Sequence, residues 1–166
     1  MTRMTQRGRD KAEQQRRDKW KNSKKLTKRI GCSQFTAIPQ NFLNSDAMIN
    51  LSGMACKLLW EFVYQVNGEN NGDLQATWSI LKDRGWKSKD TLNRALKELR
   101  EAGIITQTRQ GGRNKCSLYA LTFIAIDECL NEDGISKHDA KSSKVPLNLW
   151  HEERKEFRDK IKKESA

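Results

Sequence analysis

The most regular pattern of the chain lies in residues 88–103, where apolar side chains recur with the period of a helix. They occupy positions i, i+3, i+4 and i+7, the spacing of a single helical face: Leu92, Ala95, Leu96 and Leu99. Ser88 is a suitable N-cap, because its hydroxyl can accept a hydrogen bond from the first turn, and Gly103 can end the helix with a positive φ. The pattern predicts an amphipathic helix with one buried face and one charged face.

Two further helical patterns precede this segment. Ser52 is placed to cap a helix over residues 52–66, and Thr77 is placed to cap a second helix over residues 77–84, which Gly85 stops. A helix, a tight turn that contains glycine and a second capped helix form the helix-turn-helix pattern. Many ordinary helical hairpins share this pattern, so it predicts the arrangement without fixing a function.

Residues 104–121 have the composition of two strands joined by a glycine-rich loop. Strand-favouring side chains fill residues 104–108 and 116–121. The joining loop carries cations: Arg109, Arg113 and Lys115. A β-hairpin directly after the second helix of a helix-turn-helix is the winged-helix order of elements. The charged loop suits a phosphate or minor-groove contact, and an ordinary polar hairpin loop is the alternative interpretation.

The net charge of +11 is concentrated at the N-terminus. Residues 1–30 carry 12 Lys and Arg against 3 Asp and Glu, a net charge of +9, and their few large apolar side chains have no period. We therefore expect residues 1–34 to form a disordered, basic flexible arm. Such an arm suits a polyanion, because neutralising phosphates releases condensed counterions. A solubilising tail is the main alternative, and a membrane surface fits less well because no apolar stripe is present.

Several runs of the chain together resemble a known family of DNA-binding domains. They are FTAIPQNFL, LSGMACKLLWEFV, NNGDL, SILKDRGWKSKDTLNRALKELREAGII and LYALTF. Residues 35–125 resemble the winged-helix domain of phage and plasmid replication-initiation proteins, above all the phage replication protein O type N-terminal domain. They are also similar to helix-turn-helix proteins of bacterial mobile elements. The resemblance implies duplex DNA binding and a role at an origin.

The chain departs from that family at both ends. It carries the basic arm, and only a short region follows the second strand of the hairpin. Initiators of the family usually have a further segment that recruits a helicase. In this chain residues 131–166 would have to take that role. Transcriptional regulation and replication initiation therefore both stay open as the biological process.

The charged face of the helix over residues 88–103 supplies the candidate DNA contacts. We expect Lys89, Asn93 and Arg94 to reach base edges in the major groove and Lys97 to contact phosphate or base. Ser88 and Thr91 can contact the DNA backbone, while Arg109, Arg113 and Lys115 of the loop would straddle flanking phosphates or enter the minor groove. A solvated face with ion pairs, Arg94–Glu98 and Lys97–Glu101, is the alternative.

The C-terminal part has a different character. Residues 131–144 are polar and are expected to be a linker, and residues 145–166 are expected to form an amphipathic helix with a narrow apolar stripe. That helix could dock on the domain, pair with a second copy or bind a partner. The predicted organisation is the arm over residues 1–34, a winged helix-turn-helix domain over 35–130, the linker and the C-terminal helix. The predicted fold class is mainly α with a small β-hairpin.

Several classes of protein are excluded or disfavoured by what the sequence lacks. No apolar stretch is long enough to span a membrane, and the charged N-terminus does not have the apolar region of a secretory signal, so we expect a cytoplasmic protein. The four cysteines are far apart, without metal-ligand spacing, and no nucleotide-binding or hydrolase motif is present. We therefore expect no metal, no cofactor and no enzymatic activity.

These observations predict a double-stranded DNA-binding protein of a bacterial plasmid, phage or other mobile element, acting in transcriptional regulation or replication initiation. The expected partners are duplex DNA, a second copy of the chain and a replication protein. The alternatives are an adaptor or inhibitor that uses the same scaffold for protein contact, and an RNA-binding protein, which the basic arm would also suit.

Overall fold

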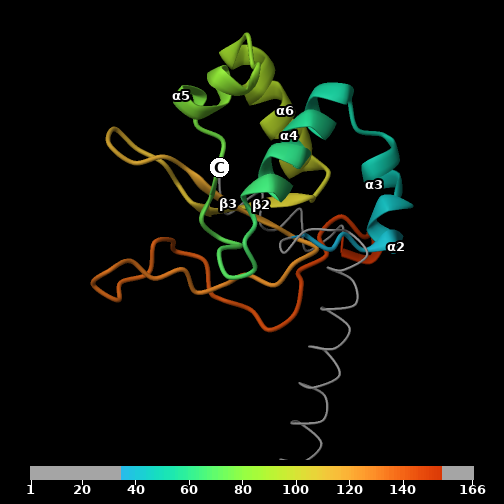
Figure 1. The fold of residues 1–166 in the computed structure, drawn as a ribbon. Coiled ribbons are helices and arrows are strands. Elements are labelled where there is room, and N and C mark those ends of the chain that lie inside the picture. Colours follow the sequence, from blue (N-terminus) through green and yellow to red (C-terminus); the bar gives the residue numbers. More distant parts are fainter. Residues whose placement is uncertain (1–34, 155–166) are drawn as a thin grey trace, which may run out of the picture. The chain divides into compact units, whose positions relative to one another are not determined.

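The computed structural model describes residues 35–154, of which residues 36–154 belong to one compact unit. The basic arm over residues 1–34 lies outside the described residues, as do residues 155–166 of the expected C-terminal helix. The element labels below are those of Figure 1.

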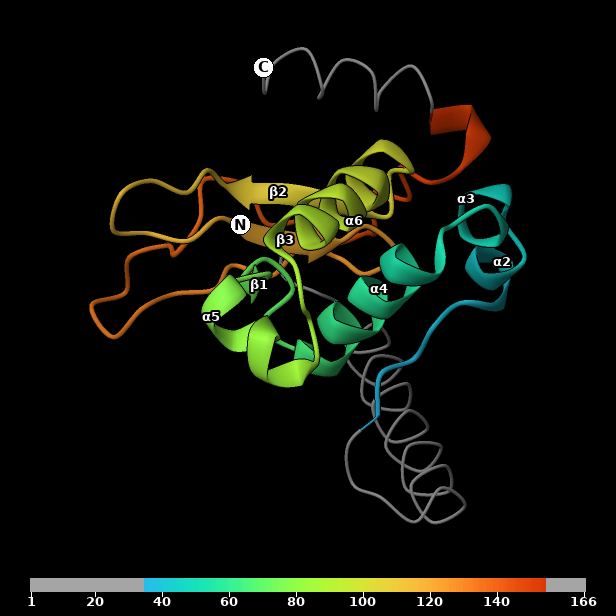
Figure 2. The same cartoon turned by 90° about the horizontal axis from the view of Figure 1, so that it is seen from above.

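Among the described residues, three α-helices precede the first strand of the sheet and two lie between its first and second strands. They are α2 (Gln40–Leu43), α3 (Asp46–Ile49), α4 (Gly53–Gln65), α5 (Trp78–Leu81) with the 3-10 turn η1 (Lys82–Arg84), and α6 (Lys89–Glu101). A further 3-10 turn, η2, covers Glu152–Arg154. The two longest helices, α4 and α6, pack against each other (Figures 1 and 2). Their serine caps form as predicted, since Ser52 accepts a hydrogen bond from Ala55 N and Ser88 accepts one from Thr91 N.

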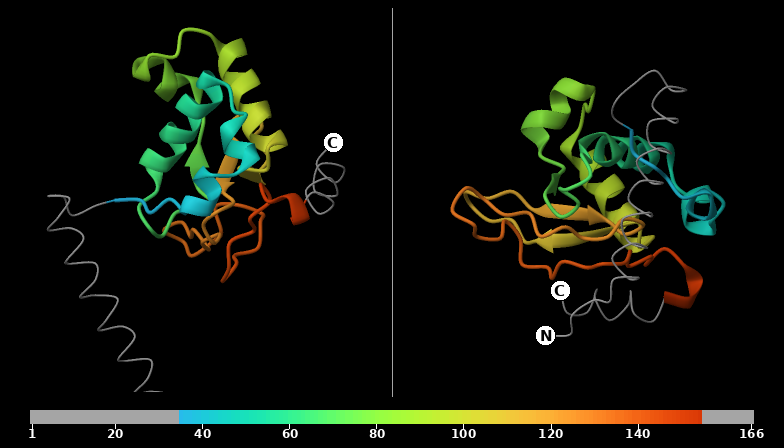
Figure 3. Two further views of the ribbon diagram at one scale, coloured as in Figure 1. Left: turned by 90° about the vertical axis from the view of Figure 1, so that its right-hand side faces the viewer. Right: turned by 60° about the horizontal axis from the view of Figure 1, so that its bottom comes forward.

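The sheet has three antiparallel strands in the order β1-β3-β2. These strands are β1 (Leu74–Gln75), β2 (Ile105–Arg109) and β3 (Leu118–Leu121). The helices lie on one side of the sheet and the segment that follows β3 lies on the other (Figure 3). All residues of β3 are buried, as expected for a central strand covered on both faces.

The core joins the two long helices to the sheet and to the end of the described chain. Leu58 and Phe62 of α4, with Leu99 of α6, are almost fully buried. Phe42 stacks on Phe123 at a ring-centroid distance of 4.5 Å and meets the Trp150 ring edge-on at 5.4 Å. Aromatic contacts of this kind add to the free energy gained by burying the rings.

A buried asparagine links the turn before β1 to the segment around β3. The side chain of Asn71 donates hydrogen bonds to the carbonyl oxygens of Leu121, Ile124 and Ala125, and its Oδ1 accepts one from Leu121 N at 2.8 Å. Backbone groups that would otherwise be buried without partners are satisfied in this way. The turn composition of residues 69–73 indicates a turn but gives no sign of this long-range role.

The expected fold class, mainly α with a small β-hairpin in a winged helix-turn-helix, is wrong. A third strand, β1, precedes α5 and pairs with β3, and α5 is a single α turn that continues as the 3-10 turn η1. The described part is therefore a small mixed fold of helices and a three-stranded antiparallel sheet, without a clear winged helix. Strand β1 was missed because two residues are too few to show an alternating pattern.

The segment after β3 also differs from the expectation. Residues 131–144, expected to be a linker, lie against the sheet, where Asp139 N donates to Thr108 O at 2.9 Å and His138 is buried. The helix expected from residue 145 does not begin there, and Leu149 and Trp150 belong to the core instead. A polar composition predicts exposure, but it cannot show that backbone groups will pair with a distant strand.

Candidate nucleic-acid interface

Helix α6 has the two faces that the sequence predicts. Leu92, Ala95 and Leu99 are buried against the core, and Leu96 is half-buried. The opposite face carries exposed polar and charged side chains: Asp90, Asn93, Arg94, Lys97 and Glu101. Burial of the inner face fixes the rotation of the helix, so the outer face is presented in one orientation.

A charged group of α6 also fixes the helix to the N-terminus of α4. The carboxylate of Glu98 accepts hydrogen bonds from the backbone N and the hydroxyl of Ser52, at 2.6 and 2.7 Å. The same hydroxyl accepts from Ala55 N, so Ser52 caps α4 while it binds Glu98. This arrangement resembles a capping box in which the glutamate comes from a neighbouring helix.

The turn before α6 is held by a buried tryptophan. Gly85 has a φ of 83°, which reverses the chain after η1, and Trp86 is buried in the core. The ammonium of Lys57 donates to Gly85 O at 3.2 Å and lies 5.2 Å from the centre of the Trp86 ring. These contacts anchor the N-terminal end of α6, where the predicted base-reading residues begin.

Two cations of α6, Arg94 and Lys97, form exposed ion pairs. Arg94 Nε lies 3.1 Å from Asp90 Oδ2 and Lys97 Nζ lies 3.9 Å from Glu101 Oε1, with the two basic side chains 73% and 75% exposed. Arg94 therefore pairs with Asp90, whereas the ion-pair alternative predicted a pair with Glu98. Ion pairs this exposed contribute between zero and about 1 kcal/mol to the stability of the fold. A phosphate or a base can therefore replace the acidic partner.

The loop between β2 and β3 presents two of the predicted cations. Gly112 N donates to Lys115 O at 2.8 Å, which closes a tight turn around Arg113 and Asn114. Arg113 and Lys115 are exposed. The loop extends beyond the sheet on the side on which α5 lies (Figures 1 and 2).

Arg109, the third cation predicted to contact DNA from this loop, is bound within the protein. Its guanidinium donates to Lys137 O at 2.7 Å and to Cys116 O at 3.1 Å. These bonds tie the base of the loop to residues 131–144. A role in holding the loop fits these contacts better than the predicted contact with flanking phosphates. Sequence patterns could not indicate this role, because both acceptors are backbone carbonyl oxygens.

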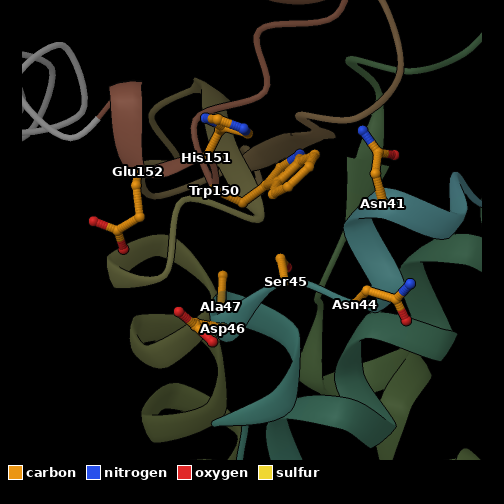
Figure 4. A pocket seen from close by; sticks show the side chains of 8 residues that line it. All are labelled: Asn41, Asn44, Ser45, Asp46, Ala47, Trp150, His151 and Glu152. Atoms are coloured by element: carbon orange, nitrogen blue, oxygen red, sulfur yellow. The ribbon is translucent and has the colours of Figure 1, made fainter.

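A pocket elsewhere on the molecule has a different character. It lies between the α2–α3 turn and the residues that follow Leu149, and its lining includes Ser45, the N-cap of α3, and the indole of Trp150 (Figure 4). Asp46 and Glu152 bring carboxylates to it. Negative charge disfavours phosphate, so the pocket is a poor candidate for contact with a nucleic-acid backbone. Nothing in the sequence singled it out, because its lining comes from segments far apart in the chain.

Over residues 35–154 no group of three His, Cys, Asp or Glu side chains is arranged to hold a metal ion. The thiols of Cys56, Cys116 and Cys129 are free. Within the same residues, no helix has the length and apolar character needed to cross a bilayer.

Comparison of the chain with protein-family models, with curated proteins and with solved structures gave no match.

Proposed function

We propose that this protein binds double-stranded DNA through the exposed face of α6 and the β2–β3 loop. The observation that carries the proposal is the form of α6. Its inner face is buried, its N-terminus is anchored, and its outer face carries Asn93, Arg94 and Lys97 in weak exposed ion pairs or open to solvent. A rigid helix with replaceable charge partners is suited to enter a major groove.

The proposal gives different tasks to different side chains. Lys89, Asn93 and Arg94 read base edges, because Arg can pair with guanine through two hydrogen bonds and Asn can pair with adenine in the same way. Lys97, Arg113 and Lys115 neutralise phosphates, and Ser88 and Thr91 lie beside the DNA backbone at the start of the helix. Arg109 is left out of this set, since its guanidinium is bound to backbone carbonyls.

The biological setting of the proposal comes from the sequence resemblance. We assign the protein to a plasmid, phage or other bacterial mobile element, in the cytoplasm, with transcriptional regulation or replication initiation as its process. A second copy of the chain and a replication protein are the proposed protein partners. A single helix reads a short site, so a pair of copies on a palindromic site would give useful specificity.

In-vitro selection from a pool of random duplexes tests this proposal. The wild-type chain should select a defined motif, and Arg94→Ala should change the preferred base at one position, because a paired contact is worth roughly 1–3 kcal/mol of discrimination. Lys141→Ala is the matched control, since Lys141 is exposed and lies outside the proposed interface. Failure of the wild-type chain to bind any duplex at low salt would end the proposal.

A further inference from the structure

The chain contains two Asn-Gly pairs, and the fold holds them in different environments. Asn67 and Gly68 follow α4 and are exposed, whereas Asn71 and Gly72 are buried in the turn before β1. In such a pair the peptide nitrogen of the glycine can attack the side-chain amide of the asparagine, because glycine has no Cβ to obstruct the approach. The fold therefore decides which of the two pairs is able to react.

The turn after α4 holds the Asn67 side chain close to the Gly68 peptide. Asn67 Oδ1 accepts a hydrogen bond from Glu69 N at 3.0 Å, which forms an Asx turn. Negative charge develops on this oxygen when a nucleophile adds to the side-chain carbonyl, so the Glu69 N–H stabilises the adduct. Within residues 35–154, neither the Gly68 N–H nor the Asn67 Nδ2 has a hydrogen-bond partner. The attacking nitrogen and the leaving group are therefore both unrestrained.

Asn71 is restrained at every polar atom of its side chain. Its Nδ2 donates to three backbone carbonyl oxygens, its Oδ1 accepts from Leu121 N at 2.8 Å, and the residue is fully buried. Rotation of the amide towards the Gly72 nitrogen would break these hydrogen bonds inside the core. A carboxylate in its place would put a buried negative charge against the same carbonyl oxygens. The fold thus protects Asn71, although a glycine follows it.

Asn131 supplies the complementary comparison. It is exposed, and its Oδ1 accepts a hydrogen bond from Asp133 N at 3.1 Å, so it forms an Asx turn like that of Asn67. Glu132 follows it, however, and the Cβ of that residue obstructs attack by its peptide nitrogen. Asn131 has the exposure without the glycine, Asn71 has the glycine without the exposure, and Asn67 has both.

We propose that Asn67 is a site of spontaneous deamidation, with water as the co-reactant. The Gly68 nitrogen forms a bond to Cγ of Asn67 as the Cγ–Nδ2 bond breaks, and the proton of the Gly68 N–H departs with Nδ2 in ammonia. Water then opens the resulting succinimide at either carbonyl, which leaves aspartate or isoaspartate at position 67. The reaction needs no electron donor or acceptor, and it does not depend on DNA binding.

The modification would weaken the turn that ends α4. Asn67 N donates to Asn70 Oδ1 at 2.8 Å, and Asn70 Nδ2 donates to the carbonyl oxygen of Gln65, the last residue of α4, also at 2.8 Å. Isoaspartate adds a methylene group to the main chain between residues 67 and 70, so the first of these hydrogen bonds loses its geometry. The new carboxylate also lies near the C-terminus of a helix, where negative charge is unfavourable. The reaction would therefore loosen this turn in one direction as the protein ages.

Mass spectrometry of peptides from the full chain, incubated in mildly alkaline buffer, tests the proposal. Cleavage after Glu69 places Asn67 and Asn71 on separate peptides, and a sample taken before incubation corrects for any loss during digestion. The amide of Asn67 should be lost progressively, while the amides of Asn71 and Asn131 persist over the same time.

Two glycine variants and an unfolded sample separate the effect of sequence from that of the fold. Gly68→Ala should slow the loss at Asn67, whereas Gly134→Ala, at another positive-φ glycine with open space around it, should not. Circular dichroism shows whether both variants are folded. In guanidinium chloride the amides of Asn67 and Asn71 should be lost at similar rates, because only the fold distinguishes them. An Asn67 amide that persists in the folded chain as long as that of Asn131, or equal loss at Asn67 and Asn71 there, would overturn the proposal.

Discussion

Glu98 of α6 binds Ser52 of the α4 N-terminus through both of its carboxylate oxygens. The contact joins the two longest helices at a point where Ser52 also caps α4. It sets the position of α6 along α4, and with it the orientation of the face that we propose to contact DNA.

Replacing Glu98 should therefore destabilise the fold. We expect Glu98→Ala to lower the free energy of unfolding by about 1–2 kcal/mol, because the two hydrogen bonds involve a charged acceptor but lie near the surface. Glu98→Gln should cost less, since one carbonyl oxygen remains as an acceptor. Urea denaturation measures the loss, and Glu132→Ala, at an exposed position, is the control. Equal stability of the Glu98→Ala and Glu132→Ala variants would contradict the account.

Substitution of the buried Asn71 should destabilise the fold more than substitution of Glu98. Asn71→Ala removes a hydrogen-bond partner from three carbonyl oxygens and from the Leu121 amide, all in or near the core, although Leu121 O keeps the bond from Ile124 N. We expect a loss of about 3 kcal/mol or more in the free energy of unfolding, because the orphaned backbone groups remain buried. Chemical denaturation followed by circular dichroism checks this, and a loss below about 1 kcal/mol would be inconsistent with the network.

Two glycines offer a matched comparison of backbone constraint. An added Cβ at Gly72, where φ is 149°, would lie 2.5 Å from His138 Nε2, whereas a Cβ at Gly112 would meet no atom within 4 Å. Gly72→Ala should destabilise the protein by roughly 2 kcal/mol or more, and Gly112→Ala should change its stability by less than about 0.5 kcal/mol. The double variant Gly72→Ala/His138→Ala removes the clash between the added Cβ and the imidazole. It should still be less stable than the wild type, because the unusual φ at residue 72 remains. Similar unfolding free energies for the two glycine variants would refute this assignment.

The protein should lose stability in alkali. Burial raises the pKa of Tyr119 above 10.0 and that of Cys129 above 9.0, and the hydrogen bond from Lys137 to Asp73 raises the pKa of that ammonium above 10.5. A raised pKa means that the folded state holds its proton more firmly, so the associated stability is present below the unfolded pKa and is lost as the pH rises through the folded one.

Urea denaturation at about pH 8 and about pH 11 measures this effect. The free energy of unfolding should fall between the two conditions, and Tyr119→Phe should make the fall shallower, because one of the groups that titrate is removed. A free energy of unfolding that rises with pH over this range would contradict the prediction, because other titrating groups would then control the pH dependence of stability.

The sequence predicted those features that depend on local spacing. The period of the apolar residues and the serine caps identified α4 and α6 to within a few residues, and the two longer strands, β2 and β3, were also recognised. The exposed face of α6 follows directly from the same period, so Asn93, Arg94 and Lys97 could be named in advance as solvent-facing residues.

Local spacing could not predict the long-range contacts of the fold. Nothing in the spacing showed that β1 would pair with β3, that Trp150 would join the core, or that Arg109 would bind the carbonyl oxygen of Lys137. Each of these contacts joins residues that are far apart in the sequence or a side chain to a backbone group. Hydrophobic periodicity and capping residues carry no information about such pairs.

The central claim is that α6 and the β2–β3 loop contact DNA, and the salt dependence of duplex binding tests it most directly. Removing two phosphate contacts with Arg113→Ala and Lys115→Ala together should reduce the slope of log K against log salt concentration by about 1.8. Lys141→Ala with Lys144→Ala removes the same charge from exposed positions outside the interface and should leave the slope unchanged. An equal change of slope in both double variants, or none in the first, would contradict the account.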